Sequence, residues 1–133
     1  AIISSGIAGT NALTGVADSW VDSTPLIVIS GQCQSEQTAD GKLRQLGVQE
    51  LDIVSVAKPI TKYSVKIDDP HKIRYYLEKA MYLARDGRPG PVWIDIPIDI
   101  QGMSIDEEEL APFEHSEADN LKGMEHAEKQ ALV

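Results

Sequence analysis

Apolar residues along this chain fall into short runs of strand length and into longer stretches with helical spacing. Continuous apolar runs are typical of strands that are covered on both faces of a sheet. The sequence predicts three such buried strands, at residues 1–4, 25–30 and 92–97, and a more alternating strand at 59–67. We expect the three buried strands to lie side by side and parallel.

Helices are predicted between the strands, at residues 11–22, at 49–56 and from Asp69 to residue 85. In the last helix Asp69 is the expected cap, Pro70 occupies the first turn, and Gly87 lies just beyond the end. The residues expected on its inward face are Ile73, Tyr76, Leu77, Ala80, Met81 and Ala84. Strands that alternate with helices predict an α/β fold with a mostly parallel sheet.

Charge is unevenly distributed and limits the classes of partner. The formal net charge is -9, and residues 101–133 hold nine Asp or Glu against two Lys. This tail is interpreted as a solvated acidic linker at 102–133, with a possible helix at 120–133, that leads towards another domain. An acidic chain without a basic stripe predicts no nucleic-acid partner.

Membrane and redox chemistry are also not expected. No apolar run approaches the roughly 20 residues that span a bilayer, and the first residues lack the pattern of a secretory leader. We therefore expect a cytoplasmic protein with no membrane partner. Cys33 is the only cysteine and predicts neither a disulfide nor a metal site. The apolar opening at Ala1 predicts a fragment whose N-terminal part is missing.

Two features follow predicted strands and could contact a ligand. The turn at residues 5–11 is rich in glycine, which allows close approach of a ligand, although a tight strand-to-helix turn needs glycine for structure alone. Gln32 follows the strand 25–30 at the edge where α/β sheets bind ligands, although a loop glutamine commonly bonds only to backbone. Cys33 and the lysines Lys58 and Lys62 are interpreted as packing and surface residues.

An ordered set of motifs fills two segments that cover residues 1 to about 101, SSGIAGTNALTGVADSWVDSTPLIVISGQ and PITKYSVKIDDPHKIRYYLEKAMYLARDGRPGPVWIDIPIDIQ. This set resembles the pyrimidine-binding domain of the acetolactate synthase family of thiamine diphosphate (ThDP) enzymes. The resemblance implies a three-layer αβα domain of the ThDP-binding fold. It also implies that residues 1–101 form part of that domain.

The family resemblance also implies a cofactor, a substrate and an assembly. These are ThDP, Mg²⁺ held by another domain, a 2-oxo acid substrate and a homodimer or tetramer, with FAD allowed in the full enzyme. The glutamate that activates ThDP in the family lies before Ala1, so no catalytic residue and no metal ligand is assigned here. We expect this chain alone to be inactive.

Residue by residue, the resemblance assigns the cofactor-binding positions Gly6, Ile7, Asn11 and Gln32, and it assigns Lys62 to a substrate channel. The family's Gly-Pro-Gly is Gly6-Ile7-Ala8 in this chain, so the family's exact backbone path is not carried over to this turn. Alternatives are another ThDP enzyme, such as an oxo-acid decarboxylase, oxalyl-CoA decarboxylase or sulfoacetaldehyde acetyltransferase. A non-catalytic α/β module for nucleotide binding or dimerisation is the alternative from a different class.

Overall fold

A parallel four-stranded sheet forms the centre of the computed structural model, which describes residues 1–39 and 43–115. The strand order is β1-β2-β4-β3, and every neighbouring pair is parallel. The predicted parallel arrangement of the three apolar strands is therefore confirmed. The strands are β1 (Ile2–Ile3), β2 (Leu26–Gln32), β3 (Tyr63–Lys66) and β4 (Pro91–Pro97).

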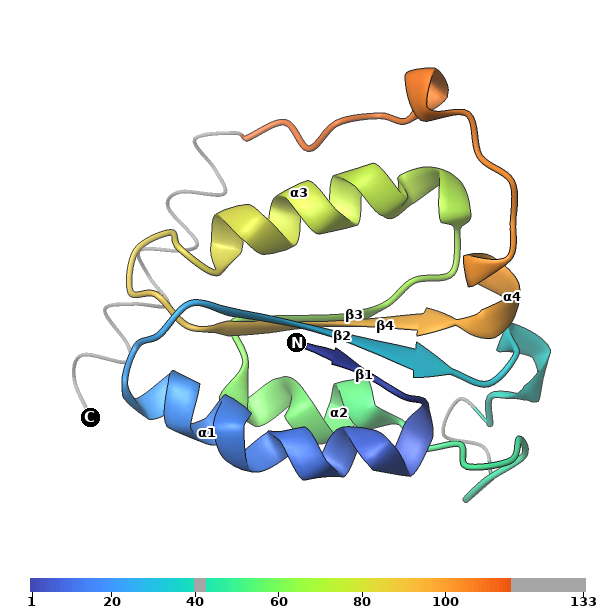
Figure 1. The fold of residues 1–133 in the computed structure, drawn as a ribbon, viewed down its shortest axis with the longest axis horizontal. Coiled ribbons are helices and arrows are strands. Elements are labelled where there is room, and N and C mark those ends of the chain that lie inside the picture. Colours follow the sequence, from blue (N-terminus) through green and yellow to red (C-terminus); the bar gives the residue numbers. More distant parts are fainter. Residues whose placement is uncertain (40–42, 116–133) are drawn as a thin grey trace.

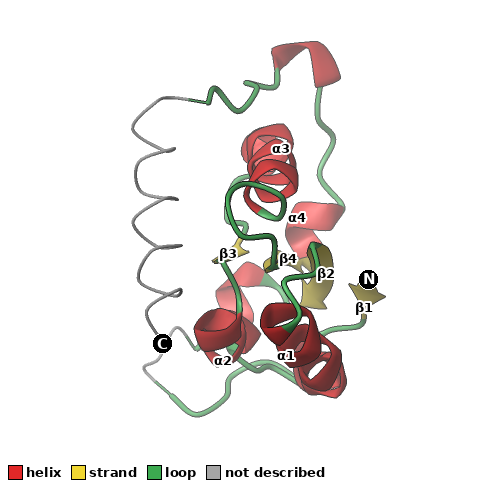
Figure 2. Ribbon diagram, turned by 90° about the vertical axis from the view of Figure 1, so that its left-hand side faces the viewer, coloured by secondary structure: helices red, strands yellow, loops and turns green. Residues whose placement is uncertain are grey.

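Helices cover both faces of the sheet and make three layers. Figures 1 and 2 show α1 and α2 on one face and α3 on the other. The fold is thus the predicted three-layer α/β architecture. The α-helices are α1 (Leu13–Val21), α2 (Ile53–Ala57), α3 (Ile73–Leu83) and α4 (Ile98–Gln101). The 3₁₀ helices are Gly6–Ala12, Ser35–Gln37, Lys58–Ile60, Pro70–Lys72 and Glu107–Glu109.

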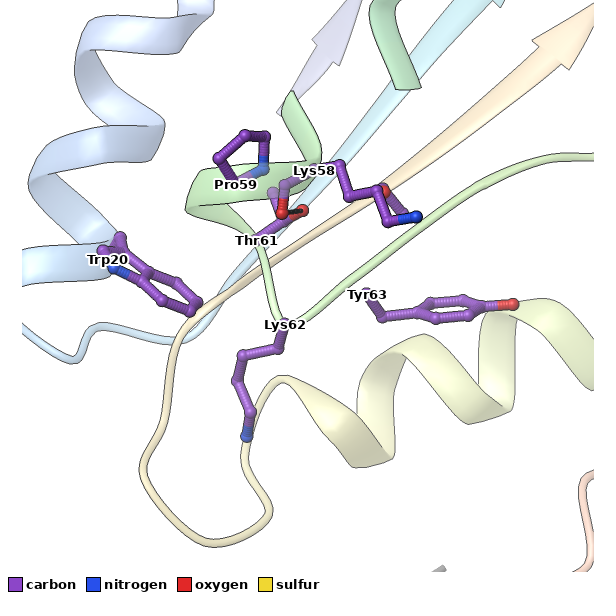
Figure 3. A pocket seen from close by; sticks show the side chains of 7 residues that line it. Trp20, Lys58, Pro59, Thr61, Lys62 and Tyr63 are labelled. Atoms are coloured by element: carbon purple, nitrogen blue, oxygen red, sulfur yellow. Dashed lines mark hydrogen bonds between the residues drawn. The ribbon is translucent and has the colours of Figure 1, made fainter. Parts of the chain in front are cut away.

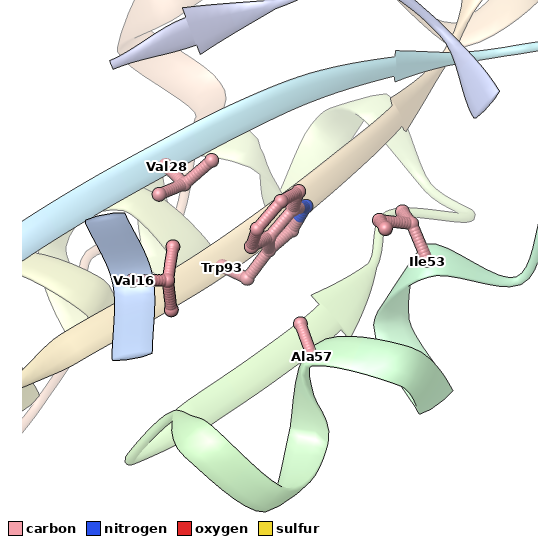
Figure 4. Packing of buried hydrophobic residues seen from close by; sticks show 5 residues of the cluster. All are labelled: Val16, Val28, Ile53, Ala57 and Trp93. Carbon is pink, nitrogen blue, oxygen red and sulfur yellow. The ribbon is translucent and has the colours of Figure 1, made fainter. Parts of the chain in front are cut away.

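Two apolar clusters hold these layers together because successive side chains of a strand point to opposite faces. Trp93 on β4 is fully buried against α1 and α2. Figure 4 shows its cluster, which consists of Val16, Val28, Ile53, Ala57 and Trp93. The neighbouring Val92 and Ile94 point the other way and pack with Ala80 of α3. The central strand β4 is thus buried on both sides.

Several predicted boundaries were wrong. The predicted helix 11–22 starts as the 3₁₀ helix Gly6–Ala12 and becomes α-helical only at Leu13. The predicted helix 49–56 begins at Ile53, because the Asp52 side chain accepts a hydrogen bond from the Ser55 N–H and caps it there. The predicted strand 59–67 is shortened to Tyr63–Lys66 by a 3₁₀ turn that contains Pro59. Conversely, β2 extends two residues beyond its predicted end, to Gln32.

The helix predicted from Asp69 to residue 85 consists of the 3₁₀ turn Pro70–Lys72 followed by α3, which ends at Leu83. The Asp69 carboxylate accepts a hydrogen bond from the His71 N–H, and Gly87 has a positive φ of 56° beyond the C-terminal end. The inward assignment of Met81 was wrong, because 47% of this side chain is exposed. The apolar stripe of α3 is thus narrower than predicted. The burial assigned to Ile2 was also wrong: it is 87% exposed, on a strand with a neighbour on one side only.

The described part of the acidic tail returns across α3 (Figure 1). Leu110 is only 7% exposed, and Phe113 packs its ring against Tyr75 and Tyr82 of α3. The predicted helix 120–133 lies outside the described residues. Within residues 1–39 and 43–115, no helix is both long enough and apolar enough to cross a membrane.

Candidate functional site

Polar side chains replace apolar ones on one face of the sheet towards its carboxyl edge. On this face Val28 pairs with Trp93, and two residues further along Ser30 pairs with Asp95. Gln32, the last residue of β2, follows on the same face because side chains alternate with a period of two. Ser30, Gln32 and Asp95 are 1%, 4% and 1% exposed. Their polar atoms therefore need partners inside the protein.

A continuous set of hydrogen bonds supplies these partners. The Trp93 indole N–H donates to Ser30 Oγ at 2.8 Å, and the Ser30 hydroxyl donates to Asp95 Oδ1 at 2.5 Å. Gln32 Nε2 donates to Asp95 Oδ2 at 3.0 Å and to the Leu51 carbonyl at 2.9 Å. These four side chains, Trp93, Ser30, Asp95 and Gln32, are called the β2–β4 network below. The network connects the sheet to the loop that precedes α2.

Burial makes the Asp95 carboxyl the most perturbed acid at this edge. Loss of solvent raises the pKa of Asp95 from 3.8 to about 6, although the hydrogen bonds from Ser30 and Gln32 and the charge of Lys66 lower it. The Asp52 carboxylate adds a further upward contribution. Above pH 6 Asp95 is thus an ionised acceptor that is held by its neighbours.

Two cavities flank Gln32. One, of about 370 Å³, lies at the carboxyl ends of β1, β2 and β4 and is lined by Ile2, Ile3, Ser4, Ser5, Ile29, Ser30, Gly31, Gln32, Ile96, Ile98 and Gln101. The other, of about 290 Å³, lies towards β3 and is lined by Gln32, Thr38, Glu50, Leu51, Asp52, Val54, Lys66 and Asp95. The first combines apolar walls with serine and glutamine groups, a composition that suits a flat ring with polar edges.

The glycine turn lies next to the first cavity and contacts protein backbone. Gly6 has a φ of +59°, and a Cβ at this position would lie 1.4 Å from the Gln49 carbonyl oxygen. Glycine is therefore required here by packing, whether or not a ligand binds. Ile7 and Asn11 are exposed on the same 3₁₀ helix. The structure thus brings the turn and Gln32 to one edge of the sheet.

Lys62 is the predicted site residue that lies elsewhere. Its backbone N–H donates to the carbonyl of Pro91, where β4 begins, whereas Gln32 pairs with Pro97, where β4 ends. Its ammonium group donates to the Asp86 carbonyl, and burial lowers the pKa of Lys62. Figure 3 shows Lys62 in a separate cavity of about 500 Å³ lined by Trp20, Lys58, Pro59, Thr61, Lys62, Tyr63 and Ser64. The substrate-channel role of Lys62 stays a prediction.

Sequence reasoning missed Asp95, Ser30 and Trp93 as parts of this site. The pattern that could have revealed them is a carboxylate in the middle of a buried apolar strand, since such a group needs hydrogen-bond donors nearby. Cys33, by contrast, is half-buried and its pKa is raised by burial and by Glu50, as expected of a packing thiol. In the described part of the chain, no group of three or more His, Cys, Asp or Glu is placed to hold a metal.

Comparison with known proteins places this geometry in a family context. A family model for the N-terminal TPP binding domain of thiamine pyrophosphate enzymes matches residues 1–56. The chain is 41% identical over 106 residues to the acetolactate synthase large subunit of Lactococcus lactis, an alignment that covers 80% of the chain and 18% of that protein.

Two further acetolactate synthase large subunits match the chain at 34–40% identity. That of isozyme 3 from Escherichia coli is 40% identical over 99 residues, which cover 74% of the chain and 16% of the relative. That of Haemophilus influenzae is 34% identical over 121 residues, which cover 91% of the chain and 20% of the relative. The chain thus spans about a fifth of the length of these relatives.

Proposed function

Because this chain belongs to the thiamine pyrophosphate enzymes and is acetolactate synthase-like, we propose that it forms the aminopyrimidine-binding side of the active site in a larger ThDP enzyme. The reaction proposed is the decarboxylation of a 2-oxo acid and the joining of its remainder to a second 2-oxo acid. The observation that carries the proposal is that the family-model match to residues 1–56 includes both the glycine turn and Gln32, which lie at one edge of the sheet.

The residues at this edge fit a flat, polar-edged ring. The cavity beside Gln32 has apolar walls at Ile3 and Ile96 and polar groups at Ser5 and Gln101. Its volume of about 370 Å³ lies in the range of small-molecule sites. The chain's own residues would orient the ring and exclude water from it. When bound, ThDP would supply a nucleophilic carbon and an electron sink for the loss of CO₂.

The remaining parts of the enzyme are assigned to protein outside this chain. We propose that another domain holds the diphosphate and Mg²⁺, and that two or four subunits assemble in the cytoplasm. We also propose that the full enzyme has room for FAD, as the acetolactate synthase resemblance allows. Within the chain, residues 1–101 would form the pyrimidine-binding domain and residues 102–133 the link to the next domain.

The test uses the full-length enzyme with four alanine variants. Asn11→Ala and Gln32→Ala should weaken ThDP binding and acetolactate formation from pyruvate by about tenfold or more, because each removes a polar group at the cofactor edge. His71→Ala and Cys33→Ala are the controls, since His71 is exposed in the 3₁₀ turn Pro70–Lys72 on the α3 side of the sheet and the Cys33 thiol packs against Gly47.

ThDP binding is measured by calorimetry, and thermal unfolding is measured to show that each variant folds. Absence of ThDP binding by the unmodified enzyme, or equal losses in all four variants, would contradict the proposal. If the enzyme forms a different product from a 2-oxo acid, the proposed ThDP chemistry stands. The activity is then that of another ThDP enzyme and not that of an acetolactate synthase.

A further inference from the structure

Two residues fix the directions of the hydrogen bonds in the β2–β4 network: Trp93, which can only donate, and the ionised Asp95, which can only accept. The Trp93 indole has an N–H and no acceptor, so Ser30 Oγ must accept from it. The Ser30 hydroxyl proton is then free to donate, and Asp95 Oδ1 receives it at 2.5 Å. The other oxygen, Oδ2, faces the Gln32 amide. An ionised carboxylate can only accept, so it requires the amide's NH₂ end.

The neighbours of Gln32 require the same orientation of its amide. Both Nε2 hydrogens are in use, one by Asp95 and one by the Leu51 carbonyl. The amide oxygen accepts from the Cys33 backbone N–H at 3.1 Å and retains a second lone pair. A ligand that reaches this side chain therefore meets an acceptor and no donor.

We propose that Asp95 is a positioning residue that holds the Gln32 amide so that its oxygen is the one group left for a ligand, which selects ligands with a hydrogen-bond donor. The exocyclic amine of an aminopyrimidine is such a donor. This inference rests on the proposed function, because it concerns how the same edge of the sheet selects its ligand. Asp95 acts through Gln32 and is not assigned any contact with the ligand.

Replacement of Asp95 by asparagine leaves the size of the side chain unchanged and breaks the pattern of donors. If the asparagine oxygen accepts from Ser30, its NH₂ faces the NH₂ of Gln32. If it accepts from Gln32, its NH₂ faces Ser30 and the Ser30 proton loses its acceptor. Either arrangement leaves a buried donor unpaired, and the first favours rotation of the Gln32 amide at the expense of its bonds to the Leu51 carbonyl and the Cys33 N–H. Rotation would present a donor to the ligand in place of an acceptor.

The experiment measures selectivity, which a purely structural role would not alter. Calorimetry on the full-length enzyme gives the Kd for ThDP and the Kd for an analogue whose pyrimidine amine is replaced by hydrogen. The Kd of the analogue divided by the Kd of ThDP reports how strongly the amine is preferred. Asp95→Asn should lower this ratio by about fivefold, as expected when one hydrogen bond is lost.

Ser30→Ala is the second variant, because it removes the hydrogen bond that anchors Asp95 and should move the ratio in the same direction. Ser19→Ala is the matched control: this buried serine donates to the Thr24 carbonyl, before β2 begins, and the ratio should not change.

Each result decides a different point. If the unmodified enzyme binds ThDP and both network variants prefer the amine as strongly as it does, the positioning role is wrong and the proposed function stands. If both Kd values rise together at a constant ratio, Asp95 is only structural. If the unmodified enzyme binds neither compound, the proposed function itself fails, and the positioning role fails with it.

Discussion

Three glycines allow the strand-to-helix turn to be tested one residue at a time. Gly6→Ala should destabilise the chain by about 1–3 kcal/mol, because the φ of +59° disfavours a side chain and the Cβ would overlap the Gln49 carbonyl. Gly9→Ala should also destabilise it, because the Cβ would lie 2.8 Å from Ile53 Cγ1.

Gly15→Ala is the control for both substitutions. No atom lies within 4 Å of a Cβ at this exposed helical position, so alanine should stabilise the chain by up to about 1 kcal/mol. Urea unfolding of the 133-residue chain measures all three variants. A loss in Gly15→Ala as large as that in Gly6→Ala would show that the turn has no special backbone requirement.

Burial of Asp95 should make stability depend on pH in the direction opposite to that of a salt-bridged carboxylate. The folded state raises the pKa of Asp95 to about 6, so between pH 4 and 6 the folded chain binds more protons at this site than the unfolded chain. The contribution of this group to stability therefore falls as the pH rises through that window. A pKa raised from 3.8 to about 6 lowers the free energy of unfolding across this window by at most about 3 kcal/mol.

Comparison of the unmodified chain with Asp95→Asn isolates this contribution from the other carboxyl groups. The free energy of unfolding of the unmodified chain, relative to the variant, should decrease from pH 4 to pH 6.5. Ser19→Ala, at a buried side chain that does not titrate, is the control and should show no such trend. A difference that is constant across this range would contradict the raised pKa.

Single residues also show how far a sequence can locate a site. Gln32 was found because it follows a buried strand, and the edge of a parallel sheet is a general property of the fold. Asp95 was missed because its strand was recognised by its apolar neighbours alone. Ser30 lies 65 residues before Asp95 in the sequence, and Trp93 lies two positions before it on the same strand. Only the register of β2 with β4 brings the three side chains together.

At the scale of elements, the tail segment 106–115 is held to α3 by a small set of contacts. The Phe113 N–H donates to Glu78 Oε2 at 2.7 Å, and its ring makes an edge contact with Tyr75. Phe113→Ala should destabilise this segment by about 1–3 kcal/mol, because it removes ring contacts with both Tyr75 and Tyr82. Hydrogen exchange of residues 102–115 should then become faster, whereas Met103→Ala, at a side chain 52% exposed, should leave exchange unchanged. Equal exchange in the two variants would mean that Phe113 does not anchor the segment.

The type and order of elements were predicted better than their ends. Apolar runs and helical stripes depend on long stretches of sequence, so the parallel sheet and its helices were recovered. Element ends depend on single capping bonds and on local competition between turn types. Asp52 moves the start of α2 to Ile53, and Pro59 favours a 3₁₀ turn where a strand was expected. Such choices are decided by a few atoms and leave little trace in the periodicity.

At the scale of the whole molecule, apolar side chains remain exposed around the candidate site. Ile2, Ile7 and Ile98 are 87%, 58% and 59% exposed, and Ile2 and Ile98 line the cavity beside Gln32. Exposed apolar groups that gather around a cavity are typical of surfaces that another protein surface covers. Trp20 is half-buried and lines the Lys62 cavity, so its fluorescence does not report on this edge.

The chain alone should therefore self-associate through the edge that carries Ile2, Ile7 and Ile98. Association removes apolar area from water, which is favourable by about 25 cal/mol per Å². Ile2→Ser with Ile7→Ser should weaken it, whereas Met81→Ser, at a side chain 47% exposed on α3, should not. Sedimentation velocity over a concentration series gives the dissociation constant of each form. A strictly monomeric chain, or an equal effect of the Met81 variant, would show that this edge does not drive assembly.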